Sequence, residues 1–272
     1  MDGPDGTTAV DAAGQSHAPA PEARILSLVP SLTETLFALG LGPRIVGRTG
    51  YCIHPRREAK AVKSVGGTKW VNWRRVMAAG ATHAVLNIDE NTREMAEELR
   101  QRGIETVVTH PIELADNGAM IRLLGRVFAC EPAAERMAAE FEAALAALPA
   151  PSEDAVRKVL YLIWKGPWMA VSSDTWISRM LARIGWRTVP AAADRRYPEV
   201  EMTDDLLAGV DLVLFSSEPF PFRDAHVALF AEEFPGHAAK ARLVDGELLS
   251  WYGVRAIQGL AYLADLTRAE AP

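Results

Sequence analysis

Strand-like and helix-like segments alternate along most of this chain, and that alternation limits the fold more than any other feature. In the first half, short runs rich in Val, Ile and Leu are separated by helical patterns or glycine-containing turns: Arg24–Val29, Arg44–Thr49, His83–Ile88 and Glu105–His110. The alternation starts again later with Lys158–Trp164 and Leu212–Ser217. This pattern predicts an α/β architecture with mostly parallel sheets covered by helices on both faces.

A long helical pattern separates the two runs of alternation. It covers residues 131–149 and carries one apolar stripe at helical spacing, made of Met137, Phe141, Ala144, Leu145 and Leu148. We therefore expect an N-terminal α/β lobe over 24–130, a bridging helix over 131–149 and a C-terminal α/β lobe over 150–272. Residues 1–23 are expected to form a disordered tail.

Local signals support this division, and the two halves look alike. Ser31 followed by Glu34 is typical of a helix-capping box. The segment from Ala78 to Asn91 passes from a helix end through glycine into a strand and an acidic turn, and the segment from Leu207 to Phe220 does the same. Similar α/β halves indicate a bilobal protein, and clefts between domains are common small-molecule sites.

Composition excludes several classes of protein. The chain of 272 residues carries 29 Lys and Arg against 35 Asp and Glu, a formal charge of -6, and no basic stripe stands out, so nucleic acid is not an expected partner. No stretch reaches the roughly 18 apolar residues of a membrane span. The two cysteines lie far apart and the six histidines show no metal-binding spacing, so we expect no metal site.

Aromatic residues gather in the turns that follow or adjoin the predicted strands. Tyr51, Trp70, Trp164, Trp168 and Tyr197 are placed in this way. Because open α/β folds bind ligands at the carboxyl ends of their strands, these side chains are candidates for ligand contact. The alternative is that each ring packs within its own lobe.

The segment Leu248–Arg255 adds two adjacent aromatics, a glycine and a cation just before the last helical pattern. We interpret it as the end of a strand and take Trp251, Tyr252, Gly253, Val254 and Arg255 as further ligand-binding candidates. Flat apolar faces beside a fixed guanidinium suit a bulky, partly planar molecule.

Motifs of catalysis do not appear. The sequence has no GxSxG elbow, no GxGxxG loop and no P-loop, and the strand-end acids Asp89, Glu90 and Glu218 have no recognisable base at a diagnostic spacing. We therefore expect a binding protein without catalytic residues and without a cofactor of its own.

Several of these segments together resemble a known family over residues 24–267. They are RILSLVPSLTETLFALGLGPRIVG, SVGGTKWVNWRRV, YLIWKGPWMAV, RRYPEV, SSEPFPF and LLSWYGVR. The resemblance is to the class III periplasmic binding proteins, or helical-backbone metal receptors, and most of all to the vitamin B12 (cobalamin) binding proteins of ABC importers. It implies two Rossmann-like lobes bridged by a single long helix, a corrinoid ligand in the cleft between them and a monomeric protein. By position it also implies that Tyr51, Tyr197 and residues 251–255 contact the ligand.

The resemblance further implies an ABC permease as partner and a periplasmic location. Members of the family usually dock through an exposed glutamate on each lobe. Here the N-terminal position reads Arg74 and Arg75, and Glu201, Asp204 and Asp205 lie near the C-terminal one. Residues 1–23 contain no Lys or Arg and no apolar run of the length a secretory signal needs, so the protein is expected to be cytoplasmic if Met1 is the true start.

Three interpretations follow from the sequence. We favour a protein that captures cobalamin or a related corrinoid, either for an ABC importer or as a carrier. A ferric siderophore or haem binder on the same scaffold is the first alternative, and it predicts several cations around the ligand. A cytoplasmic corrinoid sensor, or an enzyme that uses the cleft for chemistry, is the second.

Overall fold

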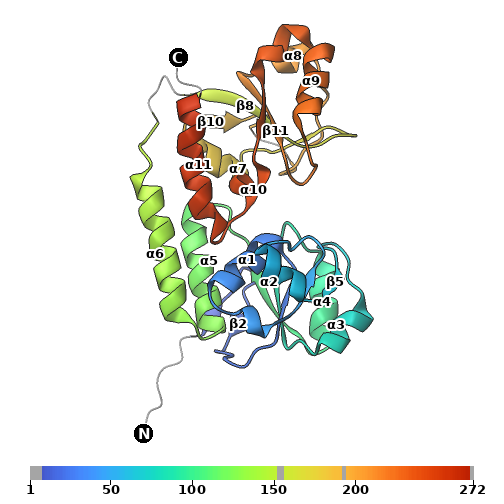
Figure 1. The fold of residues 1–272 in the computed structure, drawn as a ribbon, viewed down its shortest axis with the longest axis vertical. Coiled ribbons are helices and arrows are strands. Elements are labelled where there is room, and N and C mark those ends of the chain that lie inside the picture. The colour runs from blue at the N-terminus through green and yellow to red at the C-terminus, as the bar shows by residue number, and fades with distance from the viewer. Residues whose placement is uncertain (1–7, 152–155, 192–193, 270–272) are drawn as a thin grey trace. The chain divides into compact units, whose positions relative to one another are not determined.

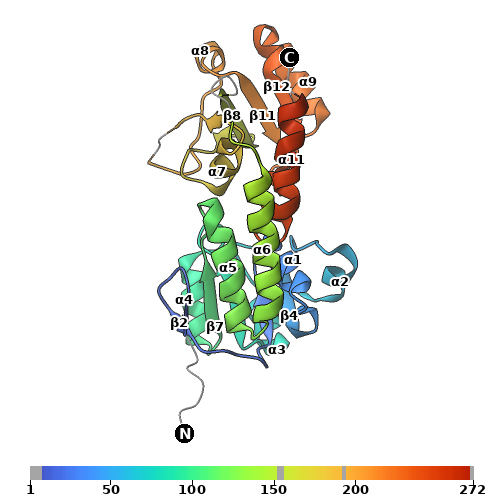
Figure 2. The ribbon, with the colours of Figure 1, turned by 90° about the vertical axis from the view of Figure 1, so that its left-hand side faces the viewer.

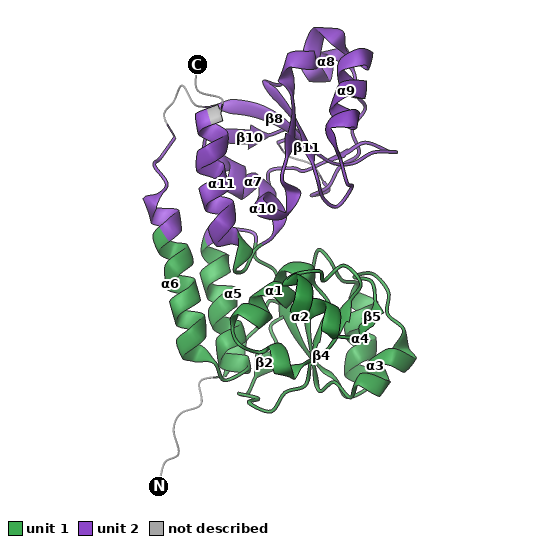
Figure 3. Cartoon of the chain, viewed as in Figure 1, with its two compact units in different colours: residues 1–111, 115–143, 252–255 green, residues 112–114, 144–251, 256–272 purple. Residues whose placement is uncertain are grey.

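The computed structural model describes residues 8–151, 156–191 and 194–269, and the chain divides into two compact units (Figure 3). Unit 1 consists of residues 1–111, 115–143 and 252–255, and unit 2 of residues 112–114, 144–251 and 256–272. No helix in the described residues combines the length and apolarity needed to cross a bilayer.

Unit 1 contains a five-stranded parallel sheet in the order β5-β4-β3-β6-β7. The strands are short. They are strongly buried because helices cover the sheet, and Leu26, Leu86 and Val76 lie in the core between sheet and helices. The elements are β3 (Ile25–Ser27), α1 (Pro30–Ala38), η1 (Gly42–Arg44), β4 (Ile45–Thr49), α2 (Arg56–Ala61), β5 (Ser64–Gly66), α3 (Trp73–Ala79), β6 (His83–Asn87), α4 (Arg93–Gln101) and β7 (Glu105–Thr109).

Two longer helices follow the sheet of unit 1 and run side by side (Figure 2): α5 (Leu114–Val127) and α6 (Glu131–Ala147). The predicted stripe of α6 is confirmed at Met137 and Phe141, which are buried. α5 was not predicted, although Arg122 on it donates to two carboxylates of α6, Glu135 at 2.7 Å and Glu142 at 2.6 Å.

Unit 2 contains a second sheet, in the order β10-β8-β11-β12, with the short β9 antiparallel to β8 (Figure 1). Its core is aromatic around Phe215, Phe222 and Phe230. The elements are β8 (Arg157–Trp164), β9 (Met169–Ala170), α7 (Trp176–Ala182), β10 (Trp186–Thr188), α8 (Asp204–Ala208), β11 (Leu212–Ser216), α9 (Asp224–Glu233), η3 (Pro235–Lys240), β12 (Ala241–Val244), α10 (Gly246–Ser250) and α11 (Arg255–Ala269).

The two sheets share one topology. In each, the first parallel strand (β3 or β8) is central, the next strand along the chain (β4 or β10) pairs on one side, and later strands (β6 and β7, or β11 and β12) pair on the other. The likeness predicted between Ala78–Asn91 and Leu207–Phe220 is therefore a likeness of β6 to β11. The order in which the chain adds strands to the sheet therefore reverses beside each central strand.

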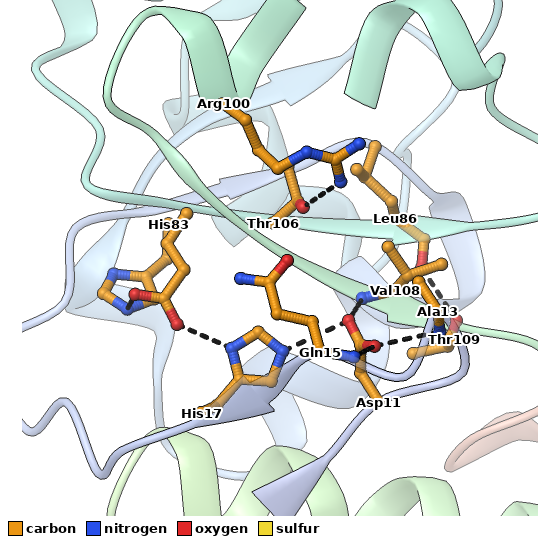
Figure 4. A network of polar contacts seen from close by, with 11 residues as sticks. Asp11, Ala13, Gln15, His17, His83, Leu86, Arg100, Thr106, Val108 and Thr109 are labelled. Atoms are coloured by element: carbon orange, nitrogen blue, oxygen red, sulfur yellow. Dashed lines mark hydrogen bonds and ion pairs between the residues drawn. The ribbon is translucent and has the colours of Figure 1, made fainter. Parts of the chain in front are cut away.

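The prediction of a disordered tail is wrong for residues 8–23, whereas residues 1–7 lie outside the described part. A small antiparallel pair, β1 (Ala9–Val10) with β2 (Ser16–His17), is fastened to unit 1 by a polar network (Figure 4). The Asp11 carboxylate accepts from the backbone N–H of Ala13, Gln15 and Val108, each at 2.9 Å. Buried His17 lies between two carboxylates, with Nε2 3.1 Å from Asp11 Oδ2 and Nδ1 2.6 Å from Glu105 Oε1.

The segment before α11 also differs from its prediction. Residues 246–250 form a helix instead of a strand, because the Asp245 side chain accepts from the backbone N–H of Leu248 at 3.0 Å and so caps the helix N-terminus. Residues 252–255 then cluster with unit 1 instead of the C-terminal lobe.

Arg255 is the main anchor of that segment in unit 1. Its Nε and Nη2 donate to the two carboxylate oxygens of Glu34, each at 2.7 Å, in a bidentate pair whose side chains are only 12% and 19% exposed. The predicted capping box is therefore wrong: α1 begins at Pro30 with Val29 as its N-cap, and Glu34 serves the ion pair instead.

We expect Asp11→Ala to destabilise unit 1 by about 3 kcal/mol, because three backbone donors would lose their acceptor, two of them from the N-terminal segment itself. Urea unfolding followed by circular dichroism measures the change. Gln101→Ala, an exposed change at the end of α4, should stay within about 0.5 kcal/mol of the parent. Equal stability of the two variants would contradict the anchored N-terminal segment.

We expect Glu34 and Arg255 to be energetically coupled by about 2 kcal/mol, since removing either partner leaves a largely buried charge unpaired. The free energies of unfolding of Glu34→Gln, Arg255→Met and the double variant measure this coupling. Strictly additive single effects would show that the pair contributes nothing beyond its separate side chains.

Candidate functional site

The carboxyl ends of the parallel strands form the candidate site of each unit. In unit 1 the loops after β3 and β6 diverge where the strand order reverses, and in unit 2 the loops after β8 and β11 do the same. Such a reversal leaves a crevice that open α/β proteins use for ligands.

Two predicted residues of unit 1 lie together. A Cβ atom added at Gly67 would lie 3.0 Å from Trp70 Nε1 and 3.3 Å from Tyr51 Cε2, so both rings pack over the bare glycine. Tyr51 is 62% exposed and Trp70 64% exposed. Exposed aromatics cost little conformational entropy to immobilise, so this pair offers an apolar surface to a ligand.

Asn91, which sequence reasoning missed, holds the loops beneath this pair. Its Nδ2 donates to Leu28 O at 3.2 Å and to Thr68 O at 2.8 Å, and its Oδ1 accepts from Asn87 N at 2.9 Å. One buried side chain therefore ties together the loops after β3, β5 and β6. The sequence offered one indication of this role, which is that residue 91 is an asparagine, and a side-chain amide can both donate to and accept from backbone groups in turns.

Glu90 and Tyr252 form the polar part of the site in unit 1. The Tyr252 hydroxyl donates to Glu90 Oε1 at 3.3 Å, and the tyrosine ring is only 6% exposed. Burial, together with the charge of Glu90, raises the pKa of Tyr252 well above its ordinary value. The phenol therefore stays protonated near neutral pH and can donate a hydrogen bond to Glu90.

The equivalent position of unit 2 carries an equivalent pair. Glu218, after β11, accepts from Trp251 Nε1 at 2.6 Å. Its backbone is held by Ser216, whose hydroxyl donates to Glu218 O at 2.6 Å and accepts from Tyr161 at 2.9 Å. Gly246 permits this arrangement, because a Cβ there would lie 2.4 Å from Ser216 Oγ.

Adjacent residues of the chain thus bind matching carboxylates, Trp251 that of Glu218 in unit 2 and Tyr252 that of Glu90 in unit 1. Both rings were expected to offer flat faces to a ligand. The structure buries them to 5% and 6% exposure and uses their N–H and O–H groups to fix the two acids.

The remaining predicted residues of this segment are also engaged within unit 1. Gly253 N donates to Asn117 Oδ1 at 2.6 Å, Asn117 Nδ2 donates back to Gly253 O at 3.2 Å, and Val254 N donates to Thr35 Oγ1 at 3.1 Å. Gly253 has φ +78°, and a Cβ there would lie 1.9 Å from Thr35 Oγ1, so no other residue fits. With Arg255 bound to Glu34, the segment supports the site by fixing backbone.

The other aromatics of unit 2 divide into exposed and packed rings. Trp164, at the end of β8, is 41% exposed and meets Phe220 edge to face at 5.6 Å. Trp168 stacks on Phe222 at 6.1 Å and packs against the core, with the Lys165 ammonium 5.1 Å from its ring. Tyr197 is half-buried. Trp164 is therefore the ring of unit 2 most available to a ligand.

The side chains predicted for partner docking are exposed, on or beside two short helices. Asp204 and Asp205 begin α8 behind the N-cap Thr203, where carboxylates also favour the helix dipole, and Glu201 precedes them. Arg74 and Arg75 are exposed on α3.

Two kinds of reactive group are relevant to the chemistry of this site, metal ligands and the thiol of Cys52. Within the described ranges, no cluster of three or more His, Cys, Asp or Glu side chains is arranged to hold a metal ion. Cys52, beside Tyr51, is fully buried with its Sγ 3.1 Å from Thr49 Oγ1, and burial raises the pKa of its thiol. Its thiolate form is therefore disfavoured.

Comparison with known sequences places the chain in a family. The model of the family described as periplasmic binding protein matches residues 25–204. A vitamin B12-binding protein of Vibrio campbellii is 25% identical over 222 residues, covering 81% of this chain and 80% of that protein. A vitamin B12-binding protein of Vibrio parahaemolyticus is 24% identical over 216 residues, covering 79% and 78%.

Solved structures share the fold. The periplasmic vitamin B12 binding protein of Vibrio cholerae superposes with a TM-score of 0.77 at 18% identity, covering 92% of this chain and 98% of that one. A periplasmic haem-binding protein of Pseudomonas aeruginosa superposes with a TM-score of 0.75 at 22% identity, covering 93% and 95%. The two-lobed α/β fold predicted from the sequence is confirmed, and this chain belongs to the periplasmic binding protein family, as its class III resemblance indicated.

Proposed function

We propose that this chain is the substrate-binding protein of an ABC importer and that its ligand is cobalamin or a related corrinoid. Proteins of this family bind small molecules, work with ABC importers and are generally not enzymes. The relatives named above as vitamin B12-binding proteins support the choice of ligand. A periplasmic location and a monomeric state belong to the same proposal, and the cleft between lobes expected from the sequence stays a prediction.

The observation that carries the choice of ligand is the charge of the candidate site. Each unit has a half-buried carboxylate in the loop where the strand order of its sheet reverses: Glu90 in unit 1 and Glu218 in unit 2. The guanidinium of Arg255 is paired with the carboxylate of Glu34. A corrinoid carries amide side chains whose N–H groups donate to carboxylates. The propionates of haem and the oxygen donors of many ferric siderophores are anionic and would be repelled.

The exposed rings supply the apolar part of the proposed contact. Tyr51 and Trp70 of unit 1 and Trp164 of unit 2 would cover the faces and edges of a corrin ring, and the displaced water would favour binding. Tyr197 and Trp168 contribute at the periphery in this proposal. The buried Trp251 and Tyr252, with Gly253 and Val254, act by fixing the acids and the backbone.

Haem is the second candidate, and one observation favours it. Lys165 lies over the Trp168 ring beside the candidate site of unit 2, and Lys69 lies beside that of unit 1, where its Nζ donates to Asp89 O at 2.8 Å. Two cations at these positions could pair with two propionates. The haem-binding protein that shares this fold supports the same alternative.

Delivery to a permease would use exposed acids of unit 2, and we propose Glu201, Asp204 and Asp205 for this contact. Their carboxylates are exposed, so they could pair with cations of a partner. On unit 1 the exposed Arg74 and Arg75 would require acidic partner residues instead. The docking surface would therefore be of mixed charge.

We expect Tyr51→Ala and Trp70→Ala each to weaken cyanocobalamin binding about tenfold, since each removes one aromatic contact. Isothermal titration calorimetry with cyanocobalamin, and separately with haemin, measures the affinities. Met77→Ala, an exposed apolar change on α3 of the same unit, should leave both unchanged. Parent protein that binds haemin more tightly than cyanocobalamin would overturn the corrinoid proposal in favour of haem.

We expect Glu218→Gln to separate the two ligands. The amide keeps an acceptor for Trp251 but removes the charge, so haemin should bind about fivefold more tightly and cyanocobalamin about fivefold more weakly. Glu232→Gln, an exposed change of the same type on α9, should alter neither affinity. A variant that binds cyanocobalamin as the parent does would remove Glu218 from the ligand site.

A further inference from the structure

Unit 1 has a cavity at the amino ends of its strands, which is the opposite end of the sheet from the candidate site. Its volume is about 1220 Å³, and it lies among the end of α1, η1, the start of β4, the end of α2, the start of β5 and α3. Aliphatic and aromatic carbon dominates its wall, including Phe37, Pro43, Ile45 and Val62. A cavity of this size can enclose a hydrocarbon chain.

Three cations line the same cavity. Arg24 donates through Nε to Gly80 O and through Nη2 to Ala79 O, both at 2.7 Å, and Arg75 donates through Nη1 to Ser64 O at 3.4 Å. Lys63 lies next to Ser64 in the chain. Since carbonyl acceptors carry no net charge, and no carboxylate of the described residues lies within 4.0 Å of these cations, their charge is not neutralised locally.

The surrounding sequence strengthens the positive charge. Between Arg44 and Arg75 the chain is rich in Lys and Arg, and Glu58 is its only carboxylate. Glu58 also lines the cavity, so three cations face one acid there. The basic character is local, because the whole chain carries a net charge of -6.

An apolar wall beside a surplus of cations is complementary to an amphipathic anion. We propose that this cavity is a second ligand site and that its ligand is a long-chain carboxylate, a fatty acid anion. Burial of the chain against Phe37, Pro43 and Val62 would remove apolar surface from water and so favour binding. Guanidinium donors left over at Arg24 and Arg75, each with five N–H groups in total, are available to the carboxylate. The site does not depend on the corrinoid proposal, since it uses the other edge of the sheet.

Calorimetry with the purified full chain tests the proposal, with decanoate below its micelle concentration as the probe. Decanoate should bind, whereas decyltrimethylammonium, with the same chain and opposite charge, and acetate, with the same head group and no chain, should each bind at least about tenfold more weakly. Equal binding of decanoate and decyltrimethylammonium would overturn the role of the cations. The proposed site would be overturned if decanoate does not bind. A result in which the protein binds phosphatidylglycerol vesicles but not decanoate would overturn it as well.

Matched variants locate the site. Arg75→Glu should weaken decanoate binding about tenfold, and Arg74→Glu, its neighbour on α3 outside the cavity wall, should leave it unchanged. Ala78→Trp, which places a bulky ring on the cavity wall, should weaken decanoate binding at least about tenfold, and Met77→Trp, adjacent but outside the wall, should not. Cyanocobalamin or haemin titration of the same variants should match the parent. Equal effects of the Arg74 and Arg75 variants would show that decanoate senses only the overall charge of the surface.

Discussion

Parallel pairing about one central strand is the constraint on which the rest of each unit depends. Because β3 and β8 each pair with neighbours that continue the chain in opposite directions along the sheet, the loops at their carboxyl ends diverge. Tyr51, Trp70, Glu90 and Glu218 follow strands at their carboxyl ends, and Trp164 is the last residue of β8. Parallel pairing also places the amino ends of the strands together at the opposite end of the sheet. The cavity lined by Arg24, Lys63 and Arg75 lies there in unit 1.

One hydrogen bond in each unit fixes the carboxylate that we propose for ligand recognition. Glu90 and Glu218 occupy equivalent positions in the two topologies, and each is held by one of two consecutive aromatic residues. A carboxylate fixed by a buried N–H or O–H group is presented in one orientation and cannot turn away from a ligand. In the function that we propose, these carboxylates would select among large ring systems by the hydrogen-bond donors at the ring periphery, and the exposed aromatic rings would contribute contact area.

The sequence was sufficient for features that depend on local pattern. The α/β alternation, the buried face of α6 and the turn positions of Tyr51 and Trp70 all follow from spacing and residue type. Features that depend on distant partners were not predictable. The Asp11 carboxylate accepts from the backbone N–H of Val108, 97 positions away. The Arg255 guanidinium pairs with the Glu34 carboxylate, 221 positions away. α5 escaped prediction because Asn117, Gly118 and Gly125 interrupt its pattern, although Gly125 lets α6 approach closely.

The N-terminal segment has a consequence beyond its own stability. β7 is the last strand of the sheet in unit 1, so one of its sides has no strand partner in the order β5-β4-β3-β6-β7. Asp11 takes the Val108 N–H on that side, and the Ala12 N–H donates to Val108 O at 3.0 Å. These contacts occupy groups that would otherwise template pairing with another chain, so the short hairpin also protects the protein against edge-to-edge aggregation.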